Sequence, residues 1–236
     1  MENIDIRFNV FSDTPVGKDP DSYSPTLRRY HRFLWSKPLP GGAMFELDLS
    51  CPRLLRHESS LGTFTLSSDG IGRTFIKIKK MSHIVDLLPL HEKEAFWNLC
   101  CTIGGFMVFP SNRIDMKPTI NGARGMSRKI EDRFDLTLEC IRRFYLKIEN
   151  PLNDTLCRYE KFFDLFIDFK GYIEYFLLQD LVDGYFSKIK FWHPFESFEN
   201  SPLPSNYDEY LTYKVRVSDF IKARNKRIQA FSDTIQ

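Results

Sequence analysis

The sequence predicts an α+β fold: a single domain in which a mixed or antiparallel sheet of short strands packs with several helices around an aromatic-rich core. Several short stretches alternate apolar and polar residues, a pattern typical of half-buried strands. Longer stretches space apolar residues three and four apart, as amphipathic helices do. Of the 236 residues, 42% are hydrophobic and 15% are aromatic, which favours one thick core. Because the sequence shows no internal repeat, no low-complexity tract and no domain boundary, residues 1–236 are expected to form one domain.

The first predicted strand covers residues 4–11, where Ile4, Ile6 and Phe8 alternate with polar residues. Further strands are expected at residues 44–49, 63–66, 73–78, 101–109 and 189–195. The stretch at residues 67–72 contains two glycines and an aspartate. It is therefore predicted to be the turn of a hairpin that joins the strands on either side of it.

A loop rich in turn-forming residues follows the first strand, at residues 12–22. It carries Asp13, Asp19 and Asp21, and long loops often bear functional residues, although plain connection is the alternative. The next helix is predicted to begin after Ser24, which suits the capping position, with Pro25 in the first turn.

This helix is predicted to end near Trp35 and carries Tyr30 and His31, two side chains that can contact a ligand. A histidine near an apolar helix face is more often a packed, hydrogen-bonded core residue than a catalytic one, and both interpretations of His31 are kept. Lys37 follows in a proline-rich turn and is a candidate for contact with a bound nucleotide.

Four further helical regions are expected from the spacing of apolar residues. They cover residues 82–100, with a break at Pro89, residues 130–147, residues 156–182, with a kink at Gly171, and residues 208–231. The last is amphipathic and charged, so it is expected to pack on the outside of the domain. The many aromatic residues of the 156–182 region are expected to form core rather than a cofactor site.

A glycine-bearing loop is predicted at residues 121–125, directly before the helix at 130–147. Asn121-Gly122 favours a turn, Gly125 tolerates close backbone approach, and Arg124 adds a fork of donors, so the loop suits a phosphate-like ligand. The alternative is a tight turn with a surface arginine. Neither the dinucleotide fingerprint nor the P-loop pattern is present.

A narrow polar strip is predicted along the 130–147 helix and the residues just before it, because acidic and basic residues recur there at steps of three and four. The strip consists of Arg128, Asp132, Asp135, Glu139 and Arg142. In one interpretation it is a solvated ladder of ion pairs on a helix that is otherwise buried. In the other, the carboxylates and guanidinium groups line a cleft that holds a ligand or a reacting proton.

The residue types suggest a nucleotide-using group-transfer enzyme, and the most specific hypothesis is a toxin-type ADP-ribosyltransferase in a bacterial defence or toxin–antitoxin system. Such an enzyme needs an acidic residue at an oxocarbenium-like centre, with donors and aromatic rings around NAD. The candidate catalytic residues are Glu139, Arg124 and His31. The candidate residues for binding NAD are Tyr30, Lys37, Asn121, Gly122, Gly125, Asp132 and Asp135. Of the short motifs typical of that class, Ser-Thr-Ser is not present, and Glu-x-Glu occurs only at Glu92-Lys93-Glu94, which is not among the candidate residues.

Two alternatives from other classes stay open. A non-enzymatic module could bind a neutralising protein partner, or nucleic acid through basic clusters at residues 28–32, 77–80 and 222–227. A metal-dependent nuclease or phosphoryl-transfer enzyme could hold divalent ions with Asp132, Asp135 and Glu139. The arginines that flank these carboxylates would oppose a cation there.

Composition argues against several other classes. A net charge of +2 gives no general attraction to a polyanion. Five cysteines without a Cys-x-x-Cys motif, together with five scattered histidines, favour reduced thiols in a cytoplasmic protein over a disulfide framework or a zinc site. The acidic N-terminus and the lack of an apolar run of about 18 residues predict neither a signal peptide nor a membrane span.

Three stretches, which begin at Thr119, Asp132 and Asp168, read TINGARG, DRFDLTLECIRR and DFKGY. Together they resemble a bacterial family of similar length that is catalogued as a domain of unknown function. The resemblance covers nearly the whole chain and includes the stretches that begin at Ser12 and Leu34. It implies no particular reaction, cofactor or site residue.

Overall fold

The computed structural model describes residues 4–235 and confirms the α+β class. A three-stranded antiparallel sheet has the order β3-β4-β5, and a two-stranded antiparallel ribbon pairs β1 with β2. The strand bounds are β1 Lys37–Pro38, β2 Met44–Phe45, β3 Leu55–Ser59, β4 Gly62–Gly70 and β5 Phe106–Pro110. The sheet is small, so most of the core is formed by helices.

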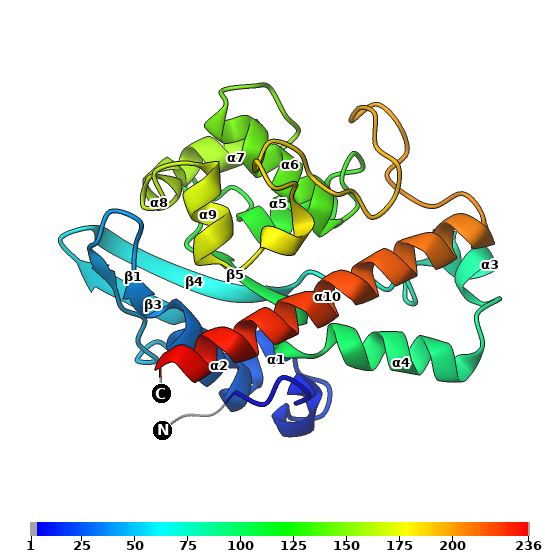
Figure 1. The fold of residues 1–236 in the computed structure, drawn as a ribbon, viewed down its shortest axis with the longest axis horizontal. Helices are drawn as coiled ribbons and strands as arrows, with labels where there is room; N and C mark the ends of the chain where they lie inside the picture. Colours follow the sequence, from blue (N-terminus) through cyan, green and yellow to red (C-terminus); the bar gives the residue numbers. More distant parts are fainter. Residues whose placement is uncertain (1–3, 236) are drawn as a thin grey trace.

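The helices surround this sheet (Figure 1). Their bounds are α1 Pro20–Tyr23, α2 Pro25–Trp35, α3 Ser82–Val85, α4 Leu90–Cys100, α5 Ile120–Met126, α6 Phe134–Tyr145, α7 Asn153–Arg158, α8 Glu160–Asp164, α9 Phe169–Tyr175 and α10 Tyr207–Ile235. Short 3-10 helices are η1 Val10–Asp13, η2 Lys79–Met81, η3 Ile103–Gly105 and η4 Gln179–Leu181. In Figure 1, α5 to α9 gather above the sheet, and α10 runs across the molecule above α4.

The central strand β4 is covered differently along its two halves. β3 pairs with its first half, from Ser59 opposite Gly62 to Leu55 opposite Leu66. β5 pairs with the second half on the other edge, from Leu66 to Gly70. Among the described residues no strand pairs with the remaining edge of residues 67–70, and α1 contacts β4 instead. This arrangement brings α1, which contains Asp21, against β4.

The long helix α10 is held by a buried cation as well as by apolar packing. Its buried face includes Tyr210, Val217 and Ile221. Fully buried Arg224 donates hydrogen bonds to the carbonyl oxygens of Gly104 (3.1 Å), Phe106 (2.6 Å) and Phe176 (3.1 Å). Arg224 therefore ties the last helix to the start of β5 and to the end of α9.

An aromatic cluster from α8 and α9 fills the centre of the domain, as expected from the sequence. Phe166 packs against Tyr172, Tyr175 and Phe176 with ring centroids 5.0–5.3 Å apart. Such contacts add to the free energy gained from burying apolar area. The aromatic-rich core is confirmed.

Several local predictions are confirmed. The helix α2 begins where its capping signal places it, with the Ser24 hydroxyl accepting a hydrogen bond from Leu27 N at 3.0 Å. The break at Pro89 separates α3 from α4. The apolar strand before Pro110 is β5, although it is shorter than expected because η3 occupies its first residues.

The predicted strand at residues 4–11 is wrong. Asn9 accepts a hydrogen bond from Phe11 N at 2.9 Å and starts η1, while Phe8 N turns back to Asp5 O. The strand at 44–49 is reduced to β2 with one isolated bridge at Asp48, and the strand at 189–195 is reduced to a single bridge. These segments satisfy their backbone groups locally.

The hairpin predicted around residues 67–72 is also wrong. β4 runs straight through residues 67–70, and no strand forms at 73–78, where Phe75 has a left-handed backbone (φ 60°). The polar side chains of residues 67–69, a composition that is typical of a turn, are instead paired with side chains from helices, as described below.

Two helix predictions need correction. Residues 121–125 do not form a loop but lie within α5, which Thr119 caps by accepting a hydrogen bond from Gly122 N at 3.3 Å. The helix expected at 130–147 begins only at Phe134, because Glu131 (φ 49°) and Asp132 (φ 61°) are left-handed. The region at 156–182 is divided into α7, α8, α9 and η4, and its principal break is at Ile167 (φ 70°) rather than at Gly171.

Candidate functional site

Three consecutive polar residues in the second half of β4 receive partners from three helices and a connecting segment. Ser67 accepts a hydrogen bond from Nδ2 of Asn121 at 3.2 Å. Ser68 lies 2.8 Å from Nε2 of His31, and Asp69 lies 2.8 Å from Nη1 of Arg124. We call Asp21, Ser68, Asp69, Arg124 and Asp132 the β4 polar cluster.

His31 is fully buried, and its hydrogen bonds decide its protonation. Trp35 donates its indole N–H to Nδ1 of His31 at 3.0 Å, so Nδ1 is an acceptor. Nε2 therefore carries the proton and donates to the Ser68 hydroxyl. Burial, helped by the positive charge of Arg224, lowers the pKa of His31 to about 3. The imidazole thus stays neutral and orients Ser68.

Arg124 is fully buried behind β4, where its guanidinium group joins two acidic residues. It donates to Oδ2 of Asp69 at 2.8 Å, to the carbonyl oxygen of Asp132 at 3.2 Å and to Oγ1 of Thr137 at 3.3 Å. Asp132 also pairs with Arg73, with 2.9 Å between Oδ2 and Nη1. The left-handed backbone at Asp132 turns this residue back towards α5.

Two carboxyl groups of the cluster have raised pKa values. Burial, followed by the negative charges of Asp69 and Asp19, raises the pKa of Asp21 to about 8. Burial also raises the pKa of Asp69 to about 6, while the positive charge of Arg124 opposes this shift. At neutral pH, Asp21 is therefore mainly protonated and Asp69 mainly ionised. Environments that separate the pKa values of neighbouring carboxyl groups are typical of general acid and base pairs.

The cluster has contact with solvent, and two buried oxygen atoms, one in the cluster and one on neighbouring Asn121, lack a hydrogen-bond partner among the described residues. The side chains of Asp69 and Asp132 keep 25% and 17% of their surface exposed. Oδ1 of Asp21 and Oδ1 of Asn121 are buried and have no hydrogen-bond partner within the described part of the protein. A buried polar atom without a partner is costly unless a ligand or water completes it.

Several predicted site residues lie elsewhere. Glu139 is buried on α6 and binds two arginines of the same helix, Arg142 and Arg143, each at 2.7 Å. Asp135 forms a fully buried ion pair with Arg133 and accepts a hydrogen bond from Trp192 N at 2.9 Å. The three carboxylates of the predicted strip therefore do not face a common cleft.

The remaining predicted residues are also separated. The Tyr30 hydroxyl accepts a hydrogen bond from Asp5 N at 3.0 Å, and Lys37 lines a different pocket. Gly122 and Gly125 are helical residues of α5, and Gly125 is exposed. The structure thus brings His31, Asn121, Arg124 and Asp132 around one half of β4, and leaves the others outside it.

Sequence reasoning missed Ser68 and Asp69 and did not select Asp21. The signal for Asp21 was present, because the loop at residues 12–22 was noted for its aspartates. The signal for Ser68 and Asp69 was masked, because a run of serine, aspartate and glycine is more typical of a turn than of a central strand.

Comparison with known proteins places the chain in a family. Residues 4–228 match the model of a family described as "Family of unknown function (DUF6994)". The chain belongs to this family. The match confirms the resemblance found in the sequence, and it spans every residue of the β4 polar cluster. No curated protein and no solved structure matches the chain.

Within residues 4–235 of this DUF6994 member, no group of three or more histidine, cysteine, aspartate or glutamate residues is arranged to hold a metal ion. The arginines explain this, since Arg124 and Arg73 occupy the carboxylates of Asp69 and Asp132. None of the described helices combines the length and the apolar character needed to cross a membrane.

Proposed function

We propose that this DUF6994 protein is a group-transfer enzyme that acts on the glycosidic bond of a nucleotide, with Asp21 and Asp69 as its acid and base. The observation that carries the proposal is the buried Oδ1 of Asp21, partnerless among the described residues, in the same cluster as Asp69, whose side chain is 25% exposed and binds Arg124. Burial raises the pKa of both carboxyl groups, to about 8 and about 6. This assignment replaces Glu139, whose carboxylate is already bound by two arginines.

The chemistry of glycosyl transfer suits such a pair. One carboxylic acid protonates the leaving group, and a second carboxylate stabilises the cationic sugar centre or activates the acceptor. Asp21 holds the proton at neutral pH and Asp69 carries the negative charge. In NAD the bond to nicotinamide is of this kind, so NAD is the first substrate to test.

The neighbouring arginines support a phosphorylated substrate. Arg73 lies beside the cluster with 40% of its side chain exposed and pairs with Asp132 through Nη1, while its Nε is buried. The exposed part of a guanidinium group can bind a phosphate oxygen. Asn121 adds a side-chain amide that already contacts Ser67.

The two alternatives from the sequence have less support. The basic cluster at 28–32 is partly structural, since Arg28 donates to the carbonyl oxygens of Cys51 and Leu54, each at 2.7 Å. In the cluster at 222–227, Arg224 is buried and Arg227 pairs with Asp180. A nucleic-acid surface built from these residues would lose its strongest donors. The metal-dependent alternative needs Asp135 and Glu139, which are bound by arginines.

The test is release of nicotinamide from NAD between pH 5 and pH 9, measured by chromatography. The rate should be highest between about pH 6 and pH 8, because Asp69 gains a proton below this range and Asp21 loses one above it. Asp21→Asn and Asp69→Asn should each lower the rate about 100-fold or more. The matched control is Asp86→Asn, at a carboxylate that is 71% exposed.

The proposal fails if both variants keep the wild-type rate. It also fails if the folded protein releases neither nicotinamide from NAD nor a base from other nucleotides. A thermal unfolding curve of each variant shows whether it is folded, so that loss of activity is not confused with loss of structure.

A further inference from the structure

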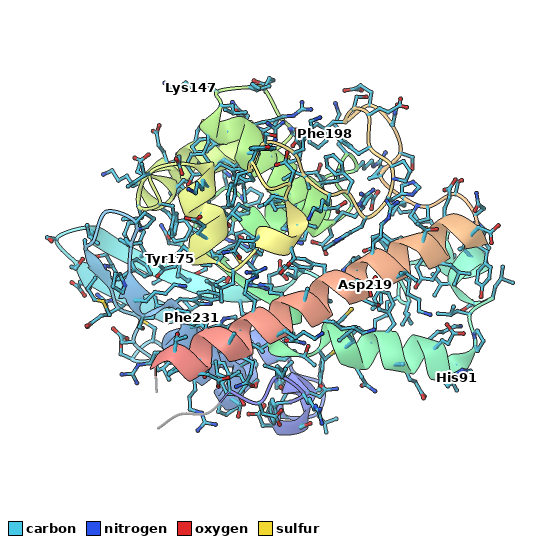
Figure 2. All side chains as sticks on the ribbon, viewed as in Figure 1. His91, Lys147, Tyr175, Phe198, Asp219 and Phe231 are labelled. Carbon is cyan, nitrogen blue, oxygen red and sulfur yellow. The ribbon has the colours of Figure 1, made fainter. Side chains whose placement is uncertain are left out.

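A pocket of about 580 Å³ lies between the β1–β2 ribbon, α9 and the C-terminal part of α10, away from the β4 polar cluster. Figure 2 shows two of its lining residues, Tyr175 at the end of α9 and Phe231 on α10, which come from distant parts of the chain. Most of the other lining side chains are apolar as well: Pro38, Leu39, Pro40 and Met44. The pocket is thus suited to an apolar group.

One cation lines this apolar pocket. Nζ of Lys37 donates a hydrogen bond to the carbonyl oxygen of Tyr175 at 2.6 Å. The same nitrogen lies 5.1 Å, 4.6 Å and 4.4 Å from the ring centroids of Trp35, Tyr175 and Phe231. Cation–π contacts of this kind hold an ammonium group without neutralising it. Within the described residues no carboxylate pairs with Lys37, so two of its three donor positions lack a conventional acceptor.

A second cation lies behind the first. Arg224 is fully buried, with its guanidinium carbon 5.9 Å from the Trp35 ring, and its hydrogen bonds go to carbonyl oxygens and to the Met107 sulfur. Its Nε has no partner, and no carboxylate in the described part of the chain pairs with it. Two cations therefore flank Trp35 without a counter-ion, which makes this side of the pocket positive.

The pKa of Lys37 reflects its burial beside a second cation. Burial, followed by the positive charge of Arg224, lowers the pKa of Lys37 to about 7. Burial also lowers the pKa of Arg224 to about 9. A single anion beside Lys37 would relieve the cost of burying both charges.

We propose that this pocket binds an organic carboxylate with an apolar tail, whose carboxylate pairs with Lys37 and whose tail contacts Met44 and Phe231. Charge complementarity selects the head group, and the apolar lining selects the tail. Glu174 also lines the pocket, but its side chain is 50% exposed and its carboxylate lies 3.8 Å from Lys170, so it is directed to another lysine. The proposed ligand is thus an amphipathic acid.

Proton uptake by Lys37 on ligand binding provides a test of the proposed site. The charged or titratable groups around Lys37 are Arg224 from α10 and Tyr175 and Glu174 from α9. Burial keeps the Tyr175 phenol protonated by raising its pKa far above neutrality, and Arg224 gives the pocket its positive charge. At pH 8, much of Lys37 is uncharged in the protein without ligand. A bound carboxylate will raise the pKa of Lys37, so that the amine takes up a proton from the solution. Binding at pH 8 should therefore take up a fraction of one proton, which calorimetry in buffers of different ionisation enthalpy measures.

The experiment compares octanoate with octan-1-ol and octylamine by titration calorimetry on the full chain. Octanoate should bind at least about tenfold more tightly than octan-1-ol, and octylamine should bind more weakly than either, because its head group repels Lys37. Lys37→Met keeps an apolar side chain of similar length and should remove the preference for octanoate over octan-1-ol. The matched control Lys222→Met, at an exposed lysine of α10, should keep it.

The proposal is overturned if octanoate and octan-1-ol bind equally to the wild-type protein, if octanoate does not bind at millimolar concentration, or if Lys37→Met keeps the preference. Should Lys37→Met fail to fold, the preference and the proton uptake of the wild-type protein decide the question. Release of nicotinamide from NAD is a separate readout, because it depends on the β4 polar cluster and not on this pocket.

Discussion

Trp35 donates its indole N–H to Nδ1 of His31 across 3.0 Å, one helical turn away on α2. This contact fixes the tautomer of a buried imidazole and aims its Nε2–H at Ser68 of the central strand. A single ring thus connects a helix and a strand beside the candidate acid–base pair, since Ser68 directly precedes Asp69 in β4.

His31 should remain neutral far below the usual pKa of histidine. In the folded protein its pKa is about 3, whereas an unfolded histidine titrates near 6.5. Because the unfolded chain binds the extra proton, this residue lowers the free energy of unfolding as pH falls below about 6.5. Nitrogen NMR should show the Nε2–H tautomer at pH 5. A charged imidazolium at that pH would contradict the expectation.

Asp21→Asn should change the pH dependence of stability. The folded pKa of Asp21, about 8, lies above its unfolded value of 3.8, so the folded state favours the protonated form. Wild-type stability should therefore fall relative to the variant as pH rises from about 4 to 8, by at most about 1.4 kcal/mol per pH unit. Solvent contact at the cluster will reduce this slope. Urea unfolding at several pH values measures it.

The matched control is Asp19→Asn, at the cap of the same short helix. Asparagine caps as well as aspartate does, so the helix is kept. Asp19 contributes less to the raised pKa of Asp21 than burial or Asp69 does, so this variant should have a smaller effect on the pH profile. Equal pH effects of the two variants would mean that Asp21 is not the residue that titrates.

The ion pairs of Asp135 and of Glu139, two acidic residues of α6, should differ strongly in their effect on stability. Asp135→Asn leaves the buried guanidinium of Arg133 without its counter-charge and should cost about 3–5 kcal/mol. Glu139→Gln breaks pairs with arginines that are 20% and 25% exposed and should cost about 1 kcal/mol. Denaturant unfolding at pH 7 distinguishes them. If both variants lose a similar amount of unfolding free energy, burial does not determine how much these ion pairs stabilise the protein.

Gly104→Ala should destabilise the contact between η3 and α10. A Cβ at this position would lie 2.5 Å from Oδ1 of Asn225 and 2.8 Å from Ile221 O, while the Gly104 amide donates to the same Asn225 oxygen. Overpacking of this kind costs about 1–3 kcal/mol. As the control, Gly125→Ala meets no atom within 4 Å and should stabilise α5 by about 0.5–1 kcal/mol. A neutral result at Gly104 would show that α10 shifts freely.

Local signals in the sequence predicted those elements whose ends are set by neighbouring residues. Ser24 and Pro25 mark the start of α2 because a cap acts within one helical turn. The α5 prediction failed for the opposite reason. Asn121-Gly122 favours a turn by itself, but the cap at Thr119 and the buried side chain of Ile120 hold the segment helical.

The candidate site was predictable only in part, because its partners lie far apart in the chain. Arg124, Asn121, Asp132 and His31 were selected from their chemistry, and the structure places them around β4. Asp69 meets Arg124 from 55 positions away. Neither the spacing nor the periodicity of residues in the sequence predicts a contact between residues so far apart. The sequence therefore favoured the polar strip on α6 as the site.

The three carbonyl groups that Arg224 binds are made at different times during synthesis. Gly104 and Phe106 precede this arginine by 120 and 118 positions, and Phe176 precedes it by 48. A ribosome has therefore completed the strands and the aromatic helices before the guanidinium that joins them exists. Until α10 docks, those oxygens must bind water, so the last helix closes the core instead of nucleating it.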